Sequence, residues 1–155
     1  MVKYSKILTK SSSQTKKIGK ILAKEFLKTF TKTALVLGLI GDLGGGKTTF
    51  LQGFAKGLGI KEKILSPSFV IIKKFKISAD SCSNSCKFAS FYHIDCYRIK
   101  KPKEILDLGF REIVSTPQNI VAIEWADRIR KILPKGTLIL KYQFANKNER
   151  KIMLK

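Results

Sequence analysis

LVLGLIGDLGGGKTTFLQGFAKGL, residues 35–58, decides the fold of this chain. A short apolar run reaches Gly41 and a helical pattern begins at Lys47, so the loop GDLGGGKT joins a strand to a helix. The loop matches GxxxxGK(S/T), in which glycines let the backbone turn with its N–H groups pointing at a phosphate. Such spacing can arise by chance, but a strand before it and a helix after it are the context that the motif requires. The stretch therefore predicts nucleotide binding.

Each part of this loop has an expected task. Lys47 can reach the β and γ phosphates of a nucleotide, and the Thr48 hydroxyl can ligate Mg²⁺. The dipole at the start of the following helix adds to the attraction for phosphate. The alternative is a glycine-rich turn that happens to carry a surface lysine. The expected nucleotide contacts within the motif and just after it are Gly41, Asp42, Leu43, Gly44, Gly45, Gly46, Lys47, Thr48 and Thr49.

Length and composition indicate one globular domain spanning residues 1–155, with 44% hydrophobic and 27% charged residues. The apolar run 34–40 is far shorter than the ~20 residues of a membrane span. Lysines interrupt any candidate leader near the N-terminus, so we expect a cytoplasmic protein with no membrane partner. An odd number of cysteines favours reduced thiols, and the C-x-x-x-C at 82–86 lacks the second ligand pair that a zinc site needs. These cysteines are Cys82, Cys86 and Cys96.

The formal charge of +20 would suit an RNA partner, because lysines bind phosphates and release counterions. A compositional explanation competes with this one: 26 of the 31 basic residues are lysine, and they are spread along the whole chain. Nothing in the sequence resembles a module that reads bases with interleaved aromatic residues, and we expect no DNA partner. The charge therefore permits RNA contact without indicating it.

Strand and helix patterns alternate along the chain and predict an α/β fold. We expect a P-loop NTPase-like three-layer sandwich, with a mostly parallel sheet and antiparallel marginal strands. A helix over 15–30 should turn Ile18, Ile21, Leu22, Phe26, Leu27 and Phe30 toward the sheet. The other expected elements are an edge strand at 4–9, a buried strand at 34–40, a helix at 47–57, strands at 69–77, 88–95 and 119–125, two helical pieces in 101–115, a short basic helix after 125 and a terminal hairpin from 137.

Two acids follow apolar runs and are expected at the carboxyl ends of parallel strands, where ligands bind. They are Asp95, after FYHI, and Glu124, after IVAI. Mg²⁺ takes one or two carboxylates and keeps several waters, so one acid can ligate the metal with Thr48 while the other orients the attacking water. The spacing does not decide between them. The alternative is that each acid only caps a helix or pairs with a lysine.

Four further residues have open assignments. Ser68, in the SPS loop after the first helix of the motif, can order around a γ-phosphate as switch loops do, or can belong to a Ser-Pro turn. His93 is interpreted as a packed, hydrogen-bonded residue in preference to a catalytic one. Arg98 can clamp a phosphate or hold Asp95 or Glu104 in place. Trp125, the only tryptophan, is either core or a partner-facing anchor. The segment 78–87 is small and polar and is expected to be an exposed hairpin tip.

The order of motifs resembles the TsaE family, the small ATPase of bacterial tRNA threonylcarbamoyladenosine synthesis. The motifs are GDLGGGKTTF, SPSF, YHIDCYR, the spacing P-x-E-x-L-x-x-G at the start of PKEILDLGF in 102–110, and EW, and the likeness runs from about residue 15 to about residue 125. This chain has Ser68 where the family usually has threonine, and its 76–88 segment is longer. After Trp125 the similarity thins.

The resemblance implies an ATPase that uses ATP and Mg²⁺, releases ADP, and acts with TsaB and TsaD on adenosine 37 of tRNAs that read codons beginning with A. It implies only indirect or weak contact with the tRNA itself. It also places Thr48 and Asp95 at the metal, makes Glu124 essential for hydrolysis, and puts Ser68 in the switch-like loop, with Lys47, Asp95 and Glu124 as the catalytic set.

Two other functions remain open from the sequence. A small-molecule or nucleoside kinase could use the same phosphate loop, but it usually needs an arginine-rich lid, and only the segment with Arg128 and Arg130 offers one. A nucleotide-gated binding module for RNA or protein, in which turnover is incidental, is the third possibility.

Overall fold

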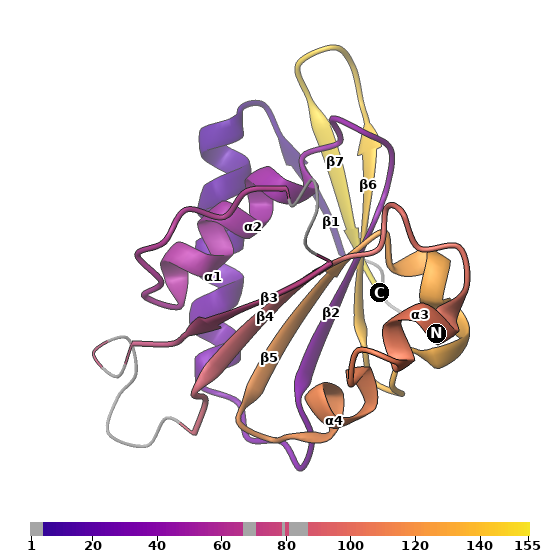
Figure 1. Ribbon diagram of the computed structural model, residues 1–155. Coiled ribbons are helices and arrows are strands. Elements are labelled where there is room, and N and C mark those ends of the chain that lie inside the picture. Colours follow the sequence, from indigo (N-terminus) through magenta and orange to yellow (C-terminus); the bar gives the residue numbers. More distant parts are fainter. Residues whose placement is uncertain (1–4, 67–70, 79, 81–86) are drawn as a thin grey trace.

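A seven-stranded sheet organises the protein in the computed structural model, which describes residues 5–66, 71–78, 80 and 87–155 (Figure 1). The strand order is β1-β7-β6-β2-β5-β4-β3. The four central strands are parallel to one another, and antiparallel strands lie at both margins, as predicted. The strands are β1 (Ser5–Thr9), β2 (Leu35–Ile40), β3 (Ile72–Lys76), β4 (Ser90–Asp95), β5 (Asn119–Glu124), β6 (Leu138–Phe144) and β7 (Arg150–Leu154).

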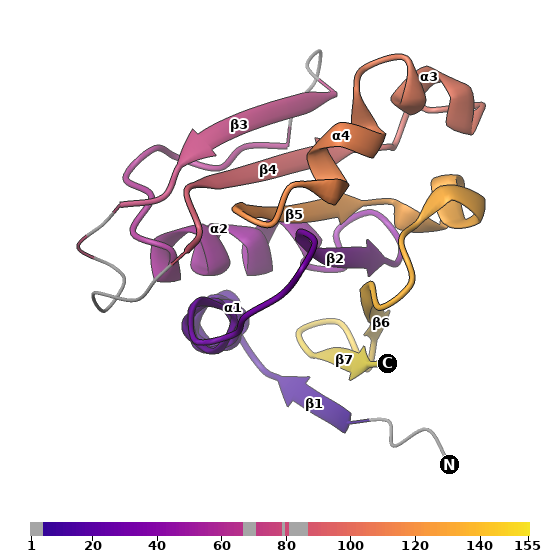
Figure 2. The ribbon, with the colours of Figure 1, turned by 90° about the horizontal axis from the view of Figure 1, so that it is seen from below.

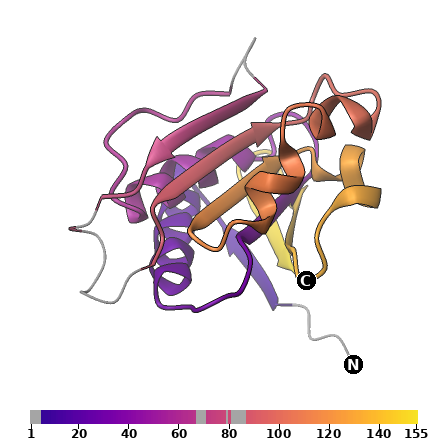
Figure 3. The same ribbon diagram turned by 60° about the horizontal axis from the view of Figure 1, so that its bottom comes forward.

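Helices cover both faces of the sheet and complete three layers. Helices α1 (Ser12–Leu27) and α2 (Lys47–Gly57) lie on one face, as seen from below in Figure 2. Helices α3 (Pro102–Leu106) and α4 (Phe110–Ser115) and the 3₁₀ helix η2 (Ala126–Ile132) lie on the other. Figure 3 shows these orange helices in front of the sheet and the indigo-to-magenta pair behind it. The short basic helix that was expected after residue 125 is present, and it is the 3₁₀ helix η2.

Small residues, and not the large apolar ones, form the centre of the contact between α1 and α2. A Cβ added at Gly53 of α2 would overlap the Lys16 carbonyl of α1, and one at Gly57 would lie 2.7 Å from the Lys20 carbonyl oxygen. The backbones of the two helices can approach this closely only because both residues lack a side chain. The prediction that Ile21 and Phe30 face inward is wrong: their exposed fractions are 50% and 66%, and α1 ends before Phe30.

The central strand β5 shows how the sheet separates two cores. All six of its residues are buried, as expected for a parallel strand covered on both faces. Successive side chains alternate between the faces. Ile120 and Ala122 join the core under α1 and α2, whereas Val121 and Ile123 join the core under α3, α4 and η2. Glu124 follows in the first series, so its carboxylate lies on the α2 side of the sheet.

Several expectations fall outside the described residues. They include Ser68 and most of the 78–87 segment with Cys82 and Cys86. Among the helices that the structure describes, none combines the length and the apolar character needed to cross a membrane.

Candidate nucleotide-binding site

The loop between β2 and α2 has a backbone that requires glycine at specific positions. Gly44 and Gly46 have φ values of 71° and 96°, in the left-handed region, and Gly46 is the N-cap of α2. A Cβ at Gly41 would lie 2.7 Å from the Tyr142 carbonyl oxygen of β6. The glycines thus let the loop turn tightly between the sheet and the start of α2, which is the conformation that phosphate binding needs.

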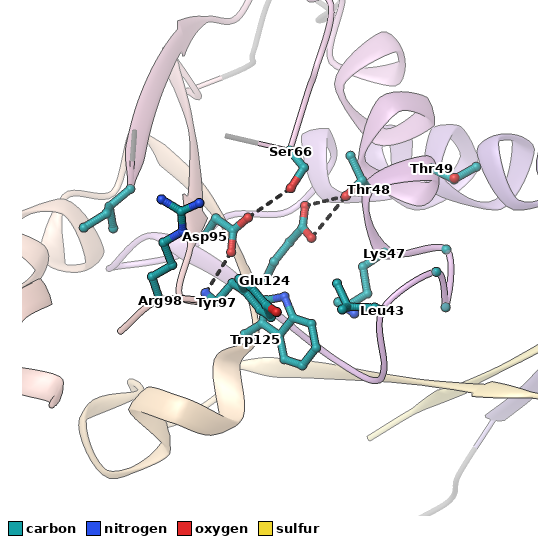
Figure 4. A pocket seen from close by; sticks show the side chains of 14 residues that line it. Leu43, Lys47, Thr48, Thr49, Ser66, Asp95, Tyr97, Arg98, Glu124 and Trp125 are labelled. Carbon is teal, nitrogen blue, oxygen red and sulfur yellow. Dashed lines mark hydrogen bonds between the residues drawn. The ribbon is translucent and has the colours of Figure 1, made fainter. Parts of the chain in front are cut away.

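This loop borders a cavity of about 460 Å³ at the carboxyl ends of β4 and β5 (Figure 4). Most of the residues predicted from the motif and the strand ends line it. Gly41 and Asp42 are not among the lining residues, and Ser68 is not described. The lining comprises Leu43, Gly44, Gly45, Gly46, Lys47, Thr48, Thr49, Ser66, Ile71, Asp95, Tyr97, Arg98, Glu124 and Trp125.

Lys47 is almost fully buried beside its own loop. Its ammonium donates hydrogen bonds to the carbonyl oxygens of Gly41 at 2.6 Å and Asp42 at 2.8 Å, and it lies 4.2 Å from the centroid of the Trp125 ring. Burial lowers the pKa of Lys47, while the negative charges of Glu124 and Asp42 raise it in part. The ammonium is therefore held at the edge of the cavity by groups that an incoming phosphate can replace.

Glu124 joins three elements through hydrogen bonds. The Thr48 hydroxyl of α2 donates to both carboxylate oxygens, at 3.1 and 3.2 Å, and His93 Nε2 of β4 lies 2.9 Å from Oε1. Because β4 and β5 are parallel, with Asp95 opposite Glu124, His93 lies two residues back on the same face as both acids. The side chains of His93 and Glu124 are 2% and 3% exposed. The expectation that His93 is packed and hydrogen-bonded is confirmed, and its partner is a residue of the site.

Asp95 is held by a different set of donors. The backbone N–H of Tyr97 donates to Oδ1 at 2.9 Å and the Ser66 hydroxyl donates to Oδ2 at 3.2 Å. Burial raises the pKa of Asp95, and the nearby Glu124 charge adds to this, against the two hydrogen bonds and His93, which lower it. Ser66, the first serine of the SPS loop, is thus the hydroxyl that the described structure places at the site. The sequence had pointed to Ser68 of the same loop, which lies outside the described residues, and Ser66 was not predicted.

Trp125 adopts a backbone conformation that is unusual for a residue with a side chain. Its φ of 58° is the only positive value among the described non-glycine residues. The turn lets its ring lie 5.1 Å from the Tyr97 ring, and the Arg128 guanidinium lies over both rings at 5.6 and 5.7 Å. Arg128 also donates to the Ile99 carbonyl at 3.3 Å. It is therefore engaged in packing next to the cavity, and the arginine lid that a kinase would need is not formed by this residue.

Two arginines approach the loop from other elements. Arg98 lines the cavity beside Asp95 (Figure 4). Arg150, at the start of β7, donates through Nε to the Gly44 carbonyl at 3.3 Å, and its guanidinium lies 4.3 Å from the Phe144 ring centroid. The terminal hairpin therefore contacts the phosphate loop, which the sequence pattern did not indicate.

The donors at the cavity suit a hard divalent cation that keeps most of its waters. Thr48, Asp95 and Glu124 offer only oxygen ligands. In the part of the chain that the structure describes, no group of three or more His, Cys, Asp or Glu residues could hold a metal by itself. Mg²⁺ fits this arrangement, because it takes one or two carboxylates and completes its shell with water and phosphate oxygens.

Comparisons with known proteins identify a family to which the chain is similar. The family model described as "Threonylcarbamoyl adenosine biosynthesis protein TsaE" matches residues 9–152. The likeness therefore continues through the terminal hairpin, beyond the point near residue 125 where the sequence motifs thin.

Individual relatives carry the same description. The tRNA threonylcarbamoyladenosine biosynthesis protein TsaE of Bacillus subtilis is 38% identical over 151 residues, covering 97% of this chain and 85% of the relative. That of Haemophilus influenzae is 30% identical over 128 residues, covering 83% and 75%. The crystal structure of Bacillus subtilis YdiB superposes with a TM-score of 0.74 at 36% identity, covering 99% of this chain and 86% of that one. With its P-loop NTPase fold, this chain belongs to the TsaE family of tRNA threonylcarbamoyladenosine biosynthesis proteins.

Proposed function

We propose that this TsaE protein binds ATP with Mg²⁺ at the cavity and hydrolyses it to ADP and phosphate, working with TsaB and TsaD in the modification of adenosine 37. The observation that carries the proposal is the bond from Thr48, the last residue of the phosphate loop motif, to Glu124 at the end of β5. It brings the two kinds of group that a nucleotide-metal site needs, a phosphate loop and a strand-end acid, into direct contact.

Lys47 and the loop backbone supply the phosphate contacts. On nucleotide binding, the Lys47 ammonium exchanges its bonds to Gly41 and Asp42 for phosphate oxygens. The N–H groups at the start of α2 point toward the same place, and their partial charges stabilise the negative charge on the γ-phosphate. Because the ammonium is already buried in the loop, it needs only a short displacement to reach a bound phosphate.

Thr48 and Glu124 are the residues that we assign to Mg²⁺. Their oxygens are in direct contact in the structure, whereas the hydrogen bonds of Asp95 go to Tyr97 and Ser66 instead. When bound, Mg²⁺ neutralises charge on the β and γ phosphates. His93 also contacts the Glu124 carboxylate, at Oε1, so we assign it as a positioning residue.

Asp95 is the residue that we assign to the attacking water. Its raised pKa suits a group that accepts a proton from water as the oxygen of that water bonds to the γ-phosphorus and the bond to ADP breaks. The hydroxyl of Ser66 links Asp95 to the loop that follows α2. A shift of Ser66 on binding of nucleotide or of a partner protein would then change the position of the acid.

The substitution Glu124→Gln tests the assignment of the acids. Glutamine keeps an oxygen that can accept from Thr48 but removes the negative charge, so we expect ATP to bind while phosphate release falls by about 10²-fold or more. Nucleotide binding is measured by calorimetry at a fixed Mg²⁺ concentration, and phosphate release is measured with and without TsaB and TsaD. Wild-type phosphate release by Glu124→Gln would contradict the role of Glu124, and transfer of phosphate to a small-molecule acceptor would favour a kinase.

A further inference from the structure

A second cavity lies beside α1, on the face of the sheet that α1 and α2 cover. It has a volume of about 1050 Å³ and is bordered by α1, α2 and the segment 59–64. It shares no lining residue with the nucleotide cavity. We call it the lysine groove, because six lysines line it: Lys16, Lys17, Lys20, Lys56, Lys61 and Lys63.

Positive charge predominates in the lysine groove. Among the described residues that line it, two are acids, Glu62 and Asp80, against the six lysines. The salt bridges of the described residues join Lys28 to Glu25 and His93 to Glu124, so none involves a groove lysine. All six lysines are exposed. Positive charges gathered in a hollow reinforce one another's field and concentrate anions there.

The packing of α1 against α2 brings these charges together. Lys16 and Lys20 lie one turn apart on α1, and like charges at this spacing disfavour an isolated helix. The absent side chains of Gly53 and Gly57 let the backbone at both lysines touch α2, beside Lys56. The fold therefore brings lysines from separate segments together around one cavity. An even distribution of lysine along the sequence does not by itself produce such a cluster.

The lining chemistry favours phosphate over bases or a protein surface. None of the described residues that line the groove is aromatic, so these residues offer no platform on which bases could stack. Its apolar members, Ile60 and Ile64, are 6% and 2% exposed, and protein interfaces are typically depleted in lysine and anchored by aromatic residues and arginine. The hydroxyls of Ser12 and Ser13 add neutral donors at the rim.

We infer that the lysine groove binds the sugar-phosphate backbone of tRNA directly and without base specificity. Because the chain belongs to a tRNA-modifying family, tRNA is the polyanion that it is expected to meet. The inference rests on that role and not on the proposed ATP hydrolysis. Contacts to phosphates position an RNA but do not read its sequence. The groove would therefore hold different tRNAs with similar affinity.

The test compares two triple substitutions in the full chain. Lys16→Ala/Lys20→Ala/Lys56→Ala removes three groove charges, and Lys103→Ala/Lys131→Ala/Lys135→Ala removes three exposed lysines from the other face. Binding of fluorescently labelled tRNA is measured by anisotropy from ~50 to ~200 mM salt, with circular dichroism as the check of folding. Alanine is a strong helix former, so the groove substitutions should leave α1 and α2 intact.

We expect the groove variant to lose at least roughly tenfold in tRNA affinity. The plot of the logarithm of the association constant against the logarithm of the salt concentration should also become less steep, by about 2 to 3 in slope, because each phosphate contact contributes slightly less than one. The control variant should keep the slope of the wild type. Equal losses in both variants, or no tRNA binding at ~50 mM salt, would overturn the inference. Loss of TsaB and TsaD capture with unchanged tRNA binding would identify an acidic protein surface instead. Phosphate release, measured in parallel, reports separately on the proposed ATPase.

Discussion

The nucleotide cavity and the lysine groove lie at opposite ends of α2 and are built on contrasting principles. At the N-terminal end, Lys47 is buried, and it is held by backbone carbonyls within reach of two buried acids. At the other end, Lys56 is exposed among groove lysines that form no salt bridge with any described residue, although Glu62 and Asp80 also line the groove. A buried charge surrounded by fixed groups serves chemistry at one place, whereas exposed like charges serve binding that depends on salt. Two lysines of one helix, nine positions apart, should therefore respond to substitution in different ways.

Lys47→Ala should produce the largest effect. Removing the ammonium takes away charge stabilisation in the transition state without removing core, so we expect phosphate release to fall by about 10³-fold with the fold retained. Lys56→Ala, in the same helix, is the matched control and should leave phosphate release unchanged. The measurement is phosphate release from ATP with Mg²⁺. Wild-type turnover in Lys47→Ala would refute the assignment of the loop.

Gly53→Ala should disturb both the nucleotide cavity and the lysine groove, because it pushes apart α1 and α2, which support them. The new Cβ would overlap the backbone carbonyl of Lys16, which cannot rotate away as a side chain could. We expect the free energy of unfolding to fall by about 2 to 3 kcal/mol. Urea denaturation measures this quantity, with Lys56→Ala as an exposed control in the same helix. An unchanged denaturation midpoint would show that the two helices can separate at little cost.

His93→Gln should have an intermediate effect on the nucleotide cavity alone. Glutamine can donate a hydrogen bond to Glu124 from the same strand, whereas His93→Ala leaves that carboxylate with one partner fewer. We expect His93→Ala to lower kcat by about 10- to 100-fold and His93→Gln to recover part of the loss, with KM for ATP little changed. A purely structural role would lower the unfolding temperature of both variants without separating their kcat values.

Asp95→Asn should have the smallest effect on stability, and that effect should be stabilising, although turnover should fall because the proton acceptor is lost. Burial raises the pKa of Asp95, so the ionised carboxylate at neutral pH costs stability, and that cost disappears as the pH falls and the group binds its proton. Asparagine removes the charge and keeps an oxygen for the Tyr97 N–H. We expect the variant to be more stable than the wild type by up to about 1 kcal/mol at neutral pH, and the difference to vanish at acidic pH. Thermal unfolding across pH measures it. A gain that persists at acidic pH would contradict this cause.

The sequence predicted the elements and most of the phosphate-loop and strand-end residues that line the cavity, because both follow from local patterns, but it did not predict that Ile71 and Tyr97 line it. An apolar run, a glycine-rich turn and a helical period specify β2, the loop and α2, and an acid after an apolar run specifies Glu124. Ser68 was predicted in the SPS loop and Ser66 was not, because two serines in one short loop have the same chemistry and only the path of the chain brings Ser66 to Asp95.

Features that depend on two distant segments were beyond the sequence pattern. The apolar period of α1 predicted an inward Ile21, but the contact with α2 is centred on small residues, since backbone approach decided the packing. The bond between Arg150 and the Gly44 carbonyl joins segments that lie far apart in sequence. The lysine groove was equally hidden, because its lysines are dispersed in the sequence and are brought together by the fold.

The most direct test of the central claim is a crystal structure of the full chain with a non-hydrolysable ATP analogue and Mg²⁺. The account predicts the triphosphate in the loop, the Lys47 ammonium moved from the Gly41 and Asp42 carbonyls to phosphate oxygens, and the metal between Thr48 and Glu124. A nucleotide bound elsewhere, or a loop in which Lys47 keeps both carbonyl bonds with the analogue present, would contradict it.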